Sequence, residues 1–537
     1  MVAGGGADLA QGNGPSVTQL PGEVAELMAG VGHGKRLHTL EQFVAREHVS
    51  EPLRSGFGMR QLDHVGHLVG YRNRGWAAGG HRRNARVRGM FDLPRLNDIT
   101  GVGRKFVGES IVEHQLIETL GNSHGPSLSA SVAIRKVDLA RRGGFPGQTG
   151  AMDKLESVVQ NYAWGDPESI PALLGRAATG EPQAELWMGA HPKAPSMIGD
   201  QSLTDVIASH PAEALGDHVA ERFGQLPFLF KVLAAAQPLS IQAHPSLSQA
   251  QAGFAREDEL GIDLGAPDRT YRDTNHKPEL ICAITPFVAK CGFRPLAEAR
   301  ELFGLLEADA VTEQLGADGP DGDVLAAVLA WLLRLPKADS ATLVRGVVEA
   351  AATAEATTFA DELEWTGIIN GYFPDDIGVV VALLLNHLVL EPGDAVFLDA
   401  GNLHAYLRGT GMELMANSDN VVRGGCTPKH IDVEELLQVV DCTPIDPPVQ
   451  RVSGAAHTFD SPVPEFQLSR YELPAGASAL EPRSAEIVFV ESGSATLTTG
   501  DESLTLAQGE VGFVRANDGP YRLDGDGVVF RASVGKS

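Results

Sequence analysis

The stretch LEPGDAVFLDAGNLHAYL, from Leu390 to Leu407, decides the fold class of the larger part of this chain. A Pro-Gly turn and a second turn at a glycine divide it into three short runs of strand-forming residues. The stretch from Glu486 to Ala516 repeats this pattern, alternating apolar and polar positions between glycine-containing turns. Short strands at regular spacing are typical of a jelly-roll barrel, so we predict two such β-barrels.

Between these two stretches lies a block with the periodicity of helices. Leu296 to Glu307 and Val324 to Leu335 place apolar residues at i, i+3 and i+4, as one buried helix face requires. The apolar run from Ile377 to Val389 suits a buried helix or a strand, and we predict a helix because a Pro-Asp-Asp start signal precedes it. We expect a β domain at 152–294 and 389–445, a helical insertion at 295–388 and a C-terminal β domain at 446–537.

Residues 1–151 differ from the rest of the chain in charge and composition. They hold 18 Lys and Arg against 13 Asp and Glu, a balance of +5. The remaining residues have a balance of −31, and the two parts add up to the net charge of −26. They are rich in glycine and sustain little helical or alternating periodicity. We interpret them as a disordered extension or a start-site artefact, with Met152 as the working start. A basic interaction arm at Arg72 to Arg88 is the alternative.

The bulk properties of the chain exclude several classes of protein. A net charge of −26 argues against nucleic-acid or anionic-membrane partners. No secretory signal is visible, and the longest apolar stretch, Val379 to Leu390, is too short to span a bilayer. The four cysteines show no CxxC spacing, which suggests a reducing compartment without a thiolate metal site. We therefore expect a cytoplasmic protein.

Three separate stretches supply candidate metal ligands. In SIQAHPS, from Ser240 to Ser246, Gln242 and His244 are two residues apart, so a strand would place both on one face. His404 follows a Gly-Asn turn at the start of a strand, in a G-D-x4-D-x-G-x2-H pattern that resembles the second metal motif of cupins. Glu279 precedes an apolar run that could place its carboxylate at the mouth of a barrel, but by itself we interpret it as an ordinary loop glutamate. Two imidazoles, a carboxylate and an amide oxygen would suit Zn²⁺.

Several long motifs occur in a fixed order along the chain. They are NYAWGDP from Asn161, AELWMGAHPKAPS from Ala184, LPFLFKVLAAAQPLSIQAHPS from Leu226, NHKPELICAITPFVAKCGFRP from Asn275 and GNLHAYLRGTGMELMANSDNVVRGGCTPKHID from Gly401. Together they resemble type I phosphomannose isomerase, a zinc-dependent family of the cupin superfamily. The resemblance covers Met152 to the C-terminus and leaves residues 1–151 without a counterpart.

The resemblance implies a fold, a reaction and a set of site residues. The fold is a cupin catalytic domain, an inserted helical domain and a C-terminal cupin-like domain. The reaction interconverts mannose 6-phosphate and fructose 6-phosphate through an enediolate, feeding GDP-mannose synthesis or mannose catabolism. One Zn²⁺ per chain would be held by Gln242, His244, Glu279 and His404. The other family positions fall on Arg423, Glu413 and Lys277 as catalytic candidates, and on Trp164, Glu185, Lys231, His276, Tyr406 and Lys429 as substrate-binding candidates.

The distribution of lysines bears on how an acidic protein binds a sugar phosphate. Only eight lysines follow residue 151, and Lys231, Lys277, Lys290 and Lys429 are among those that lie within the site motifs. We predict that Lys231, Lys277, Lys429 and Arg423 form one cationic patch, since arginine can bind an anion bidentately. Lys290 is instead expected to pair structurally near Cys291.

Two other functions use the same residues. Two histidines and a carboxylate also describe a cupin Fe(II) oxygenase. A non-catalytic sugar-phosphate-binding cupin is the second alternative. Residues 1–151 show no glycine-rich nucleotide loop of a nucleotidyltransferase, so we expect isomerase activity alone, from a monomer.

Overall fold

The computed structural model describes residues 152–355 and 358–535, and the interpretation of residues 1–151 lies outside this range. The chain is mainly β, with helices between strands, as predicted. An 11-stranded sheet carries most of the candidate site residues. Its strands are β2 (Val158–Gln160), β3 (Glu185–Met188), β6 (Phe228–Ala235), β7 (Ile241–Ala243), β8 (Glu279–Ala283), β9 (Phe287–Phe293), β10 (Leu385–Leu390), β11 (Ala395–Leu398), β12 (His404–Ala416), β13 (Val422–Gly425) and β14 (Val449–Gln450).

The long strand β12 joins the two parts of this sheet. Its last eight residues, Gly409 to Ala416, pair with β6, and most of them also pair with β8. Its first residues pair with β7 and β9, and the register with β9 shifts between Tyr406 and Arg408. In the described part of the chain, strand pairing closes no sheet into a complete ring, so the predicted barrels are open sheets in their hydrogen bonding.

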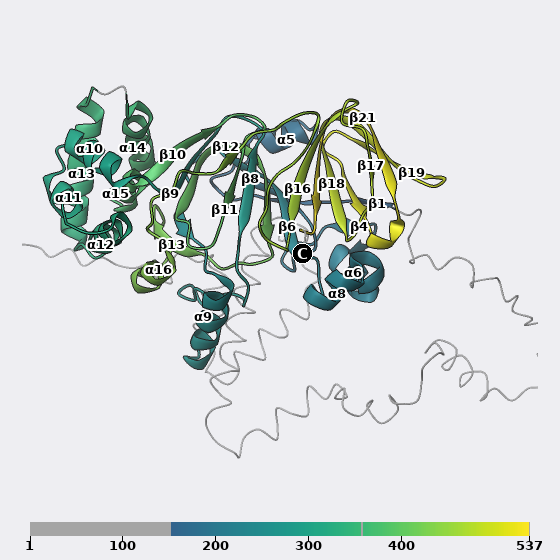
Figure 1. The fold of residues 1–537 in the computed structure, drawn as a ribbon, viewed down its shortest axis with the longest axis horizontal. Coiled ribbons are helices and arrows are strands. Elements are labelled where there is room, and N and C mark those ends of the chain that lie inside the picture. Colours follow the sequence, from purple (N-terminus) through teal and green to yellow (C-terminus); the bar gives the residue numbers. More distant parts are fainter. Residues whose placement is uncertain (1–151, 356–357, 536–537) are drawn as a thin grey trace, which may run out of the picture. The chain divides into compact units, whose positions relative to one another are not determined.

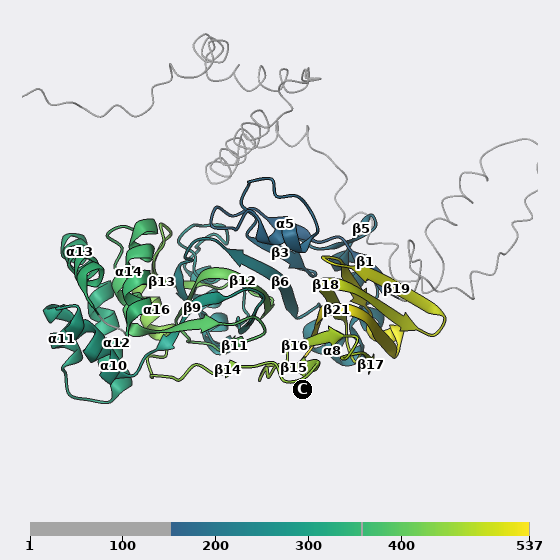
Figure 2. The same ribbon diagram turned by 90° about the horizontal axis from the view of Figure 1, so that it is seen from above.

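A second sheet of eight strands holds the C-terminal residues. It comprises β1 (Met152–Leu155), β15 (Ala456–Thr458), β16 (Gln467–Leu473), β17 (Ser478–Leu480), β18 (Glu486–Thr499), β19 (Glu502–Ala507), β20 (Val511–Val514) and β21 (Tyr521–Ser533). Strand β1 pairs with β20, which the local pattern around Met152 does not indicate. The first strand described is thus bound into the last sheet (Figure 2).

Helices follow β9 and lie together beside β9, β10 and β13 (Figure 1). They are α10 (Leu296–Leu305), α11 (Asp309–Leu315), α12 (Asp321–Leu333), α13 (Lys337–Thr353) and α14 (Ala360–Tyr372). The predicted helices at Leu296 and Val324 are confirmed, and their apolar faces are buried in one cluster with the strands. Further helices are α5 (Ser169–Leu173), α6 (Leu203–Ser209), α7 (Pro211–Leu215), α8 (Asp217–Phe223), α9 (Leu247–Glu259) and α16 (Val433–Val439). Among the described residues, no helix is both long enough and apolar enough to cross a membrane.

The prediction of one helix over Ile377 to Val389 is wrong in its second half. A short helix α15 (Gly378–Val381) and a 3-10 turn (Ala382–Leu384) precede strand β10, which begins at Leu385. Strand β10 pairs with β9 over most of its length. A continuous apolar run suits a buried helix or a buried strand equally, so the long-range pairing with β9 decides between them.

Strand alternation assigns the two faces of the central strands. Phe228, Phe230, Val232 and Ala234 of β6 share one buried cluster with Ile487 and Phe489 of β18 and with other C-terminal residues. The intervening residue Lys231 must point to the other face, because successive side chains in a strand alternate. Leu280 and Leu414 also belong to this cluster. By the same alternation, their neighbours Glu279 and Glu413 point to the opposite face. The charged side chains therefore converge on the face away from the C-terminal sheet.

Candidate metal centre

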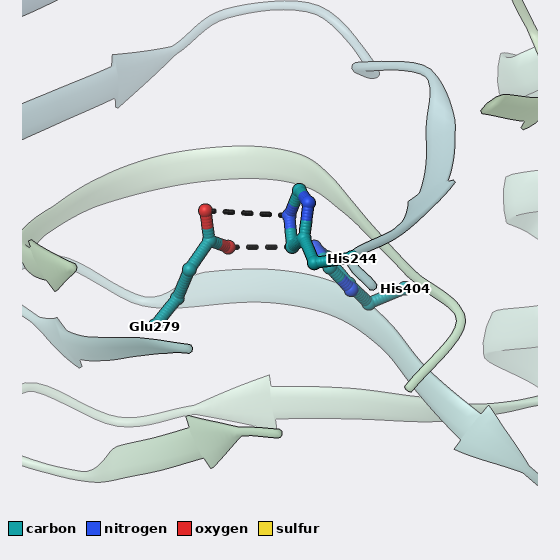
Figure 3. A group of neighbouring side chains, drawn as sticks. All are labelled: His244, Glu279 and His404. Carbon is teal, nitrogen blue, oxygen red and sulfur yellow. Dashed lines mark ion pairs between the residues drawn. The ribbon is translucent and has the colours of Figure 1, made fainter. Parts of the chain in front are cut away.

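Three candidate ligands from distant parts of the sequence meet at the ends of three strands. His244 directly follows β7, Glu279 begins β8 and His404 begins β12. One ligand atom from each lies within 4.8 Å of the other two (Figure 3). Glu279 Oε1 lies 3.4 Å from His244 Nε2, and Glu279 Oε2 lies 3.4 Å from His404 Nε2. All three side chains are buried, so any charge that they bind is shielded from solvent.

Backbone carbonyls orient both imidazole rings. His244 Nδ1 lies 2.8 Å from the carbonyl oxygen of Asn420, and His404 Nδ1 lies 3.0 Å from that of Asn402. A carbonyl only accepts, so each Nδ1 must carry the proton and each Nε2 presents a lone pair. Neither Nε2 has a hydrogen-bond partner among the described residues, and the same is true of Glu279 Oε2. Three buried acceptors facing one another require a cation between them, and imidazole and carboxylate suit zinc.

Electrostatics keep two of these side chains, His244 and Glu279, in their ligating forms. Burial, reinforced by Lys277, lowers the pKa of His244 to about 4, so the ring is neutral at physiological pH. Burial acts to raise the pKa of Glu279, but the ammonium of Lys277 outweighs it and holds the pKa well below its usual range. The carboxylate is therefore ionised.

Gln242 occupies a position compatible with a fourth ligand. It is the Cα partner of His404 in the pairing of β7 with β12, and of Arg423 in the pairing of β7 with β13. Directly paired residues project from the same face with Cβ atoms about 5 Å apart. The amide of Gln242 thus belongs to the same face as the His404 ring. Strand β7 ends one residue earlier than the sequence predicts, at Ala243.

Two of the predicted cations are neutralised by carboxylates beside this group. Lys231 Nζ lies 2.9 Å from Glu413 Oε2 and 3.5 Å from Glu185 Oε1, and all three side chains are buried. Trp187 Nε1 donates a 2.7 Å hydrogen bond to Glu185 Oε2. Lys277 Nζ lies 2.6 Å from Glu279 Oε1. Two cations of the predicted patch, Lys231 and Lys277, are therefore already paired with carboxylates.

The other two predicted cations form an uncompensated cluster with Arg272. Burial and the charge of Arg272 lower the pKa of Arg423, and burial together with Arg423 and Arg272 lowers that of Lys429. Within residues 152–355 and 358–535, neither Arg423 nor Lys429 has a carboxylate within 4.0 Å. Sequence reasoning missed Arg272, which stands three residues before Asn275, where the quoted NHKPEL motif begins.

The remaining predicted residues lie around the metal group or beside it. Tyr406 is buried, with its ring 5.9 Å from that of His404. Trp164 is partly buried against the same apolar cluster as Tyr406. His276 Nε2 lies 3.0 Å from Glu465 Oε1, a residue beyond β15 that the motifs do not include. The expectation for Lys290 is wrong, since its Nζ has no hydrogen-bond partner among the described residues.

A β-rich fold with buried imidazole and carboxylate ligands at its strand ends defines a metal-binding protein of the cupin type. Two family models match the chain: "Phosphomannose isomerase type I, catalytic domain" over residues 152–296, and "Mannose-6-phosphate isomerase, cupin domain" over residues 455–534. The chain is 41% identical over 395 residues to mannose-6-phosphate isomerase of Escherichia coli K12, covering 71% of this chain and 99% of that protein. The chain belongs to the type I phosphomannose isomerase family.

Further relatives and solved structures agree with this assignment. The human mannose-6-phosphate isomerase is 34% identical over 407 residues, covering 68% of this chain and 93% of that protein. A crystal structure of mannose 6-phosphate isomerase bound with zinc and yttrium matches with a TM-score of 0.66 and 39% identity, covering 72% of this chain and all of that one. The apo form from Salmonella typhimurium matches with a TM-score of 0.67, 40% identity and the same coverage. The predicted cupin-type fold and family are confirmed.

Proposed function

We propose that this chain is a mannose-6-phosphate isomerase that interconverts mannose 6-phosphate and fructose 6-phosphate. The observation that carries the proposal is the convergence of three buried, otherwise unpartnered ligand atoms from His244, Glu279 and His404. The names of the relatives supply the substrate, and a structure bound with zinc supplies the metal. We expect one Zn²⁺ per chain, with Gln242 as the fourth ligand.

The reaction moves a proton between C1 and C2 of the open-chain sugar through an enediolate. Zinc bound at this group supplies Lewis-acid stabilisation of the negative charge that develops on the sugar oxygens. Glu413 is our first candidate for the proton-transferring base, because burial raises the pKa of its carboxyl, against the opposing effect of Lys231. Lys277, in contact with Glu279, is the second candidate.

The phosphate of the substrate needs cations that no carboxylate already neutralises. Arg423 and Lys429 meet that condition, and Arg272 adds to their positive field. We propose that these three side chains bind the phosphate, with Arg423 offering two parallel N–H donors. Lys231 and Glu185 would instead hold sugar hydroxyls from the ion-paired side, with His276, Trp164 and Tyr406 lining the pocket.

We further propose a domain division and a cellular setting. The division is that expected from the sequence, with the helices α10 to α14 inserted between β9 and β10. A cytoplasmic monomer without nucleic-acid or membrane partners fits the net charge of −26 and four cysteines that are all buried free thiols. Light scattering of the purified chain would test the monomer.

One assay on one sample tests the function. The full chain should convert mannose 6-phosphate without O₂ or a reductant, lose activity on chelation and regain it with zinc, while metal analysis reports one zinc per chain. Dependence on O₂ would favour an Fe(II) oxygenase. Binding of mannose 6-phosphate without turnover by the zinc-loaded chain would favour a sensor. Full activity after exhaustive demetallation would exclude the metal role.

A further inference from the structure

A second group of basic side chains, two of them buried and one partly buried, lies where β9 and β10 meet the helices. Ala289 and Cys291 of β9 belong to the apolar cluster of Tyr406, on the side of the metal group, whereas Val288 belongs to the cluster of the helices. Lys290, between Ala289 and Cys291, therefore faces the helices. Its Cα partner on β10 is His387.

A β-bulge lies next to this pair. Cys291 and Gly292 of β9 stand opposite the single residue Asn386 of β10, so the extra residue is on β9. The side-chain Nδ2 of Asn386 donates hydrogen bonds to the carbonyl oxygens of Cys291, at 3.1 Å, and Ile445, at 3.0 Å. Directly paired residues project from the same face, so the His387 side chain lies on the same face of the sheet as that of Lys290. The ring centroid of Trp365 from α14 lies 6.4 Å from that of His387.

Four buried nitrogen atoms in this group have no hydrogen-bond partner in the described part of the chain. They are Lys290 Nζ, Arg294 Nε and both ring nitrogens of His387. Arg294 is held in place through another nitrogen, which lies 2.9 Å from Glu362 Oε1 and 2.9 Å from the carbonyl oxygen of Leu385. Buried donors are normally satisfied, so unpartnered donors from β9, from the residue directly after it and from the paired strand β10 indicate a shared acceptor.

The charges of the group indicate what that acceptor is. Arg294 and Glu362 form an ion pair, so their charges cancel. This leaves the charge of Lys290 uncompensated. Asp361, on the exposed surface of α14, acts on Lys290 only through its negative charge, which raises the pKa of the lysine. Burial and the two neighbouring cations lower the pKa of His387 to about 3, so its ring is neutral and contributes one N–H donor. Burial, then Arg294, lowers the pKa of Lys290 to about 7. An anion next to Lys290 would restore its protonated form.

We propose that Lys290, His387 and Arg294 bind one small monovalent anion, of the size and charge of chloride or bromide, at the junction of β9, β10 and α14. A single negative charge balances the one uncompensated cation, and a bare ion accepts hydrogen bonds from all three side chains. Lys290 and Arg294 are each 1% exposed, which favours a monatomic ion over a sugar phosphate. The anion would tie the helices to β9, whose Cys291 is the Cα partner of His404.

Thermal unfolding of the zinc-loaded full chain tests the proposal in solution. At equal ionic strength, sodium bromide should raise the unfolding temperature by about 2 °C relative to sodium gluconate, since a ligand stabilises the state that binds it. Lys290→Met should abolish this difference and keep isomerase activity. Lys337→Met, which removes an exposed lysine at the start of α13, should retain the difference. A wild-type chain indifferent to bromide, or a Lys290→Met chain that still responds, would overturn the proposal.

Crystallography of the wild-type chain provides a test that does not depend on a variant folding. Crystals soaked in sodium bromide should show an anomalous bromine peak in hydrogen-bond contact with Lys290 Nζ and His387. Water without anomalous signal at that point would overturn the proposal. Either result leaves the isomerase assignment untouched, because the two groups lie on opposite faces of β9.

Discussion

Removing the positive charge of Lys231 should destabilise the chain far more than removing a lysine from a surface ion pair. Lys231→Met leaves Glu413 and Glu185 buried beside each other without the ammonium that both contact, at 2.9 Å and 3.5 Å. Breaking a buried pair by deleting one partner costs about 3–5 kcal/mol, because the remaining charge stays desolvated. We expect a loss of unfolding free energy in that range.

The matched control is Lys193→Met. Lys193 Nζ lies 2.8 Å from Asp419 Oδ2, a distance similar to that of the buried pair, but its side chain is 64% exposed. Solvent screening limits such a pair to about 0–1 kcal/mol. Urea unfolding of the metal-free proteins, followed by circular dichroism and tryptophan fluorescence, measures both variants without interference from metal affinity.

The pH dependence has a definite sign. Burial raises the folded-state pKa of the Glu413 carboxyl, and loss of Lys231 removes the charge that opposes this. A carboxyl with a raised folded pKa binds more protons folded than unfolded, so stability falls as the pH rises from about 4.5 through the folded pKa. The deficit of Lys231→Met should therefore be smaller at pH 5 than at pH 8. Adding Glu413→Gln should recover most of it at pH 8.

Three results would refute this reasoning. The first is a loss for Lys231→Met no larger than that for Lys193→Met. The second is a double variant, Lys231→Met with Glu413→Gln, that is no more stable than the single one. The third is a deficit that grows as the pH falls.

Three further predictions concern phosphate binding, the C-terminal contact and the start of the fold. Arg423→Ala should lower kcat/KM for mannose 6-phosphate at least about tenfold with zinc content intact. Arg423→Lys should recover only part of this kcat/KM, since lysine lacks the planar guanidinium with its two parallel N–H donors. Unchanged kinetics would contradict the phosphate role. Glu465→Gln should lower kcat without changing zinc content or unfolding temperature, because Glu465 orients His276 through a 3.0 Å contact; an unchanged kcat would show that the contact is only structural. A chain beginning at Met152 should unfold and turn over substrate like the full chain. A chain beginning at Glu156 loses β1 and its pairing with β20, so it should unfold at a temperature several degrees lower. Equal unfolding temperatures would show that β1 adds nothing to stability.

Local sequence pattern was sufficient for the secondary structure near the site and for part of the ligand set. The spacing of Gln242 and His244, and the glycine turn before His404, report the period of a strand, which is a property of neighbouring residues. Glu279 had no such local signal and depended on the family resemblance. The apolar run at Ile377 to Val389 was ambiguous for the same reason, since its strand half exists only through pairing with β9.

What the sequence determined by itself is the chemistry available at the site: imidazole, carboxylate and amide groups on strands, lysines close by in an acidic chain, and long motifs that specify the family. Only the tertiary structure decided which charges meet. It paired Lys231 with Glu413 across two strands and left Arg423 and Lys429 with Arg272. It also buried Lys290 without a hydrogen-bond partner among the residues that the structure describes. The physical reason is that side-chain alternation follows from local geometry, whereas strand register and burial depend on contacts between residues hundreds of positions apart.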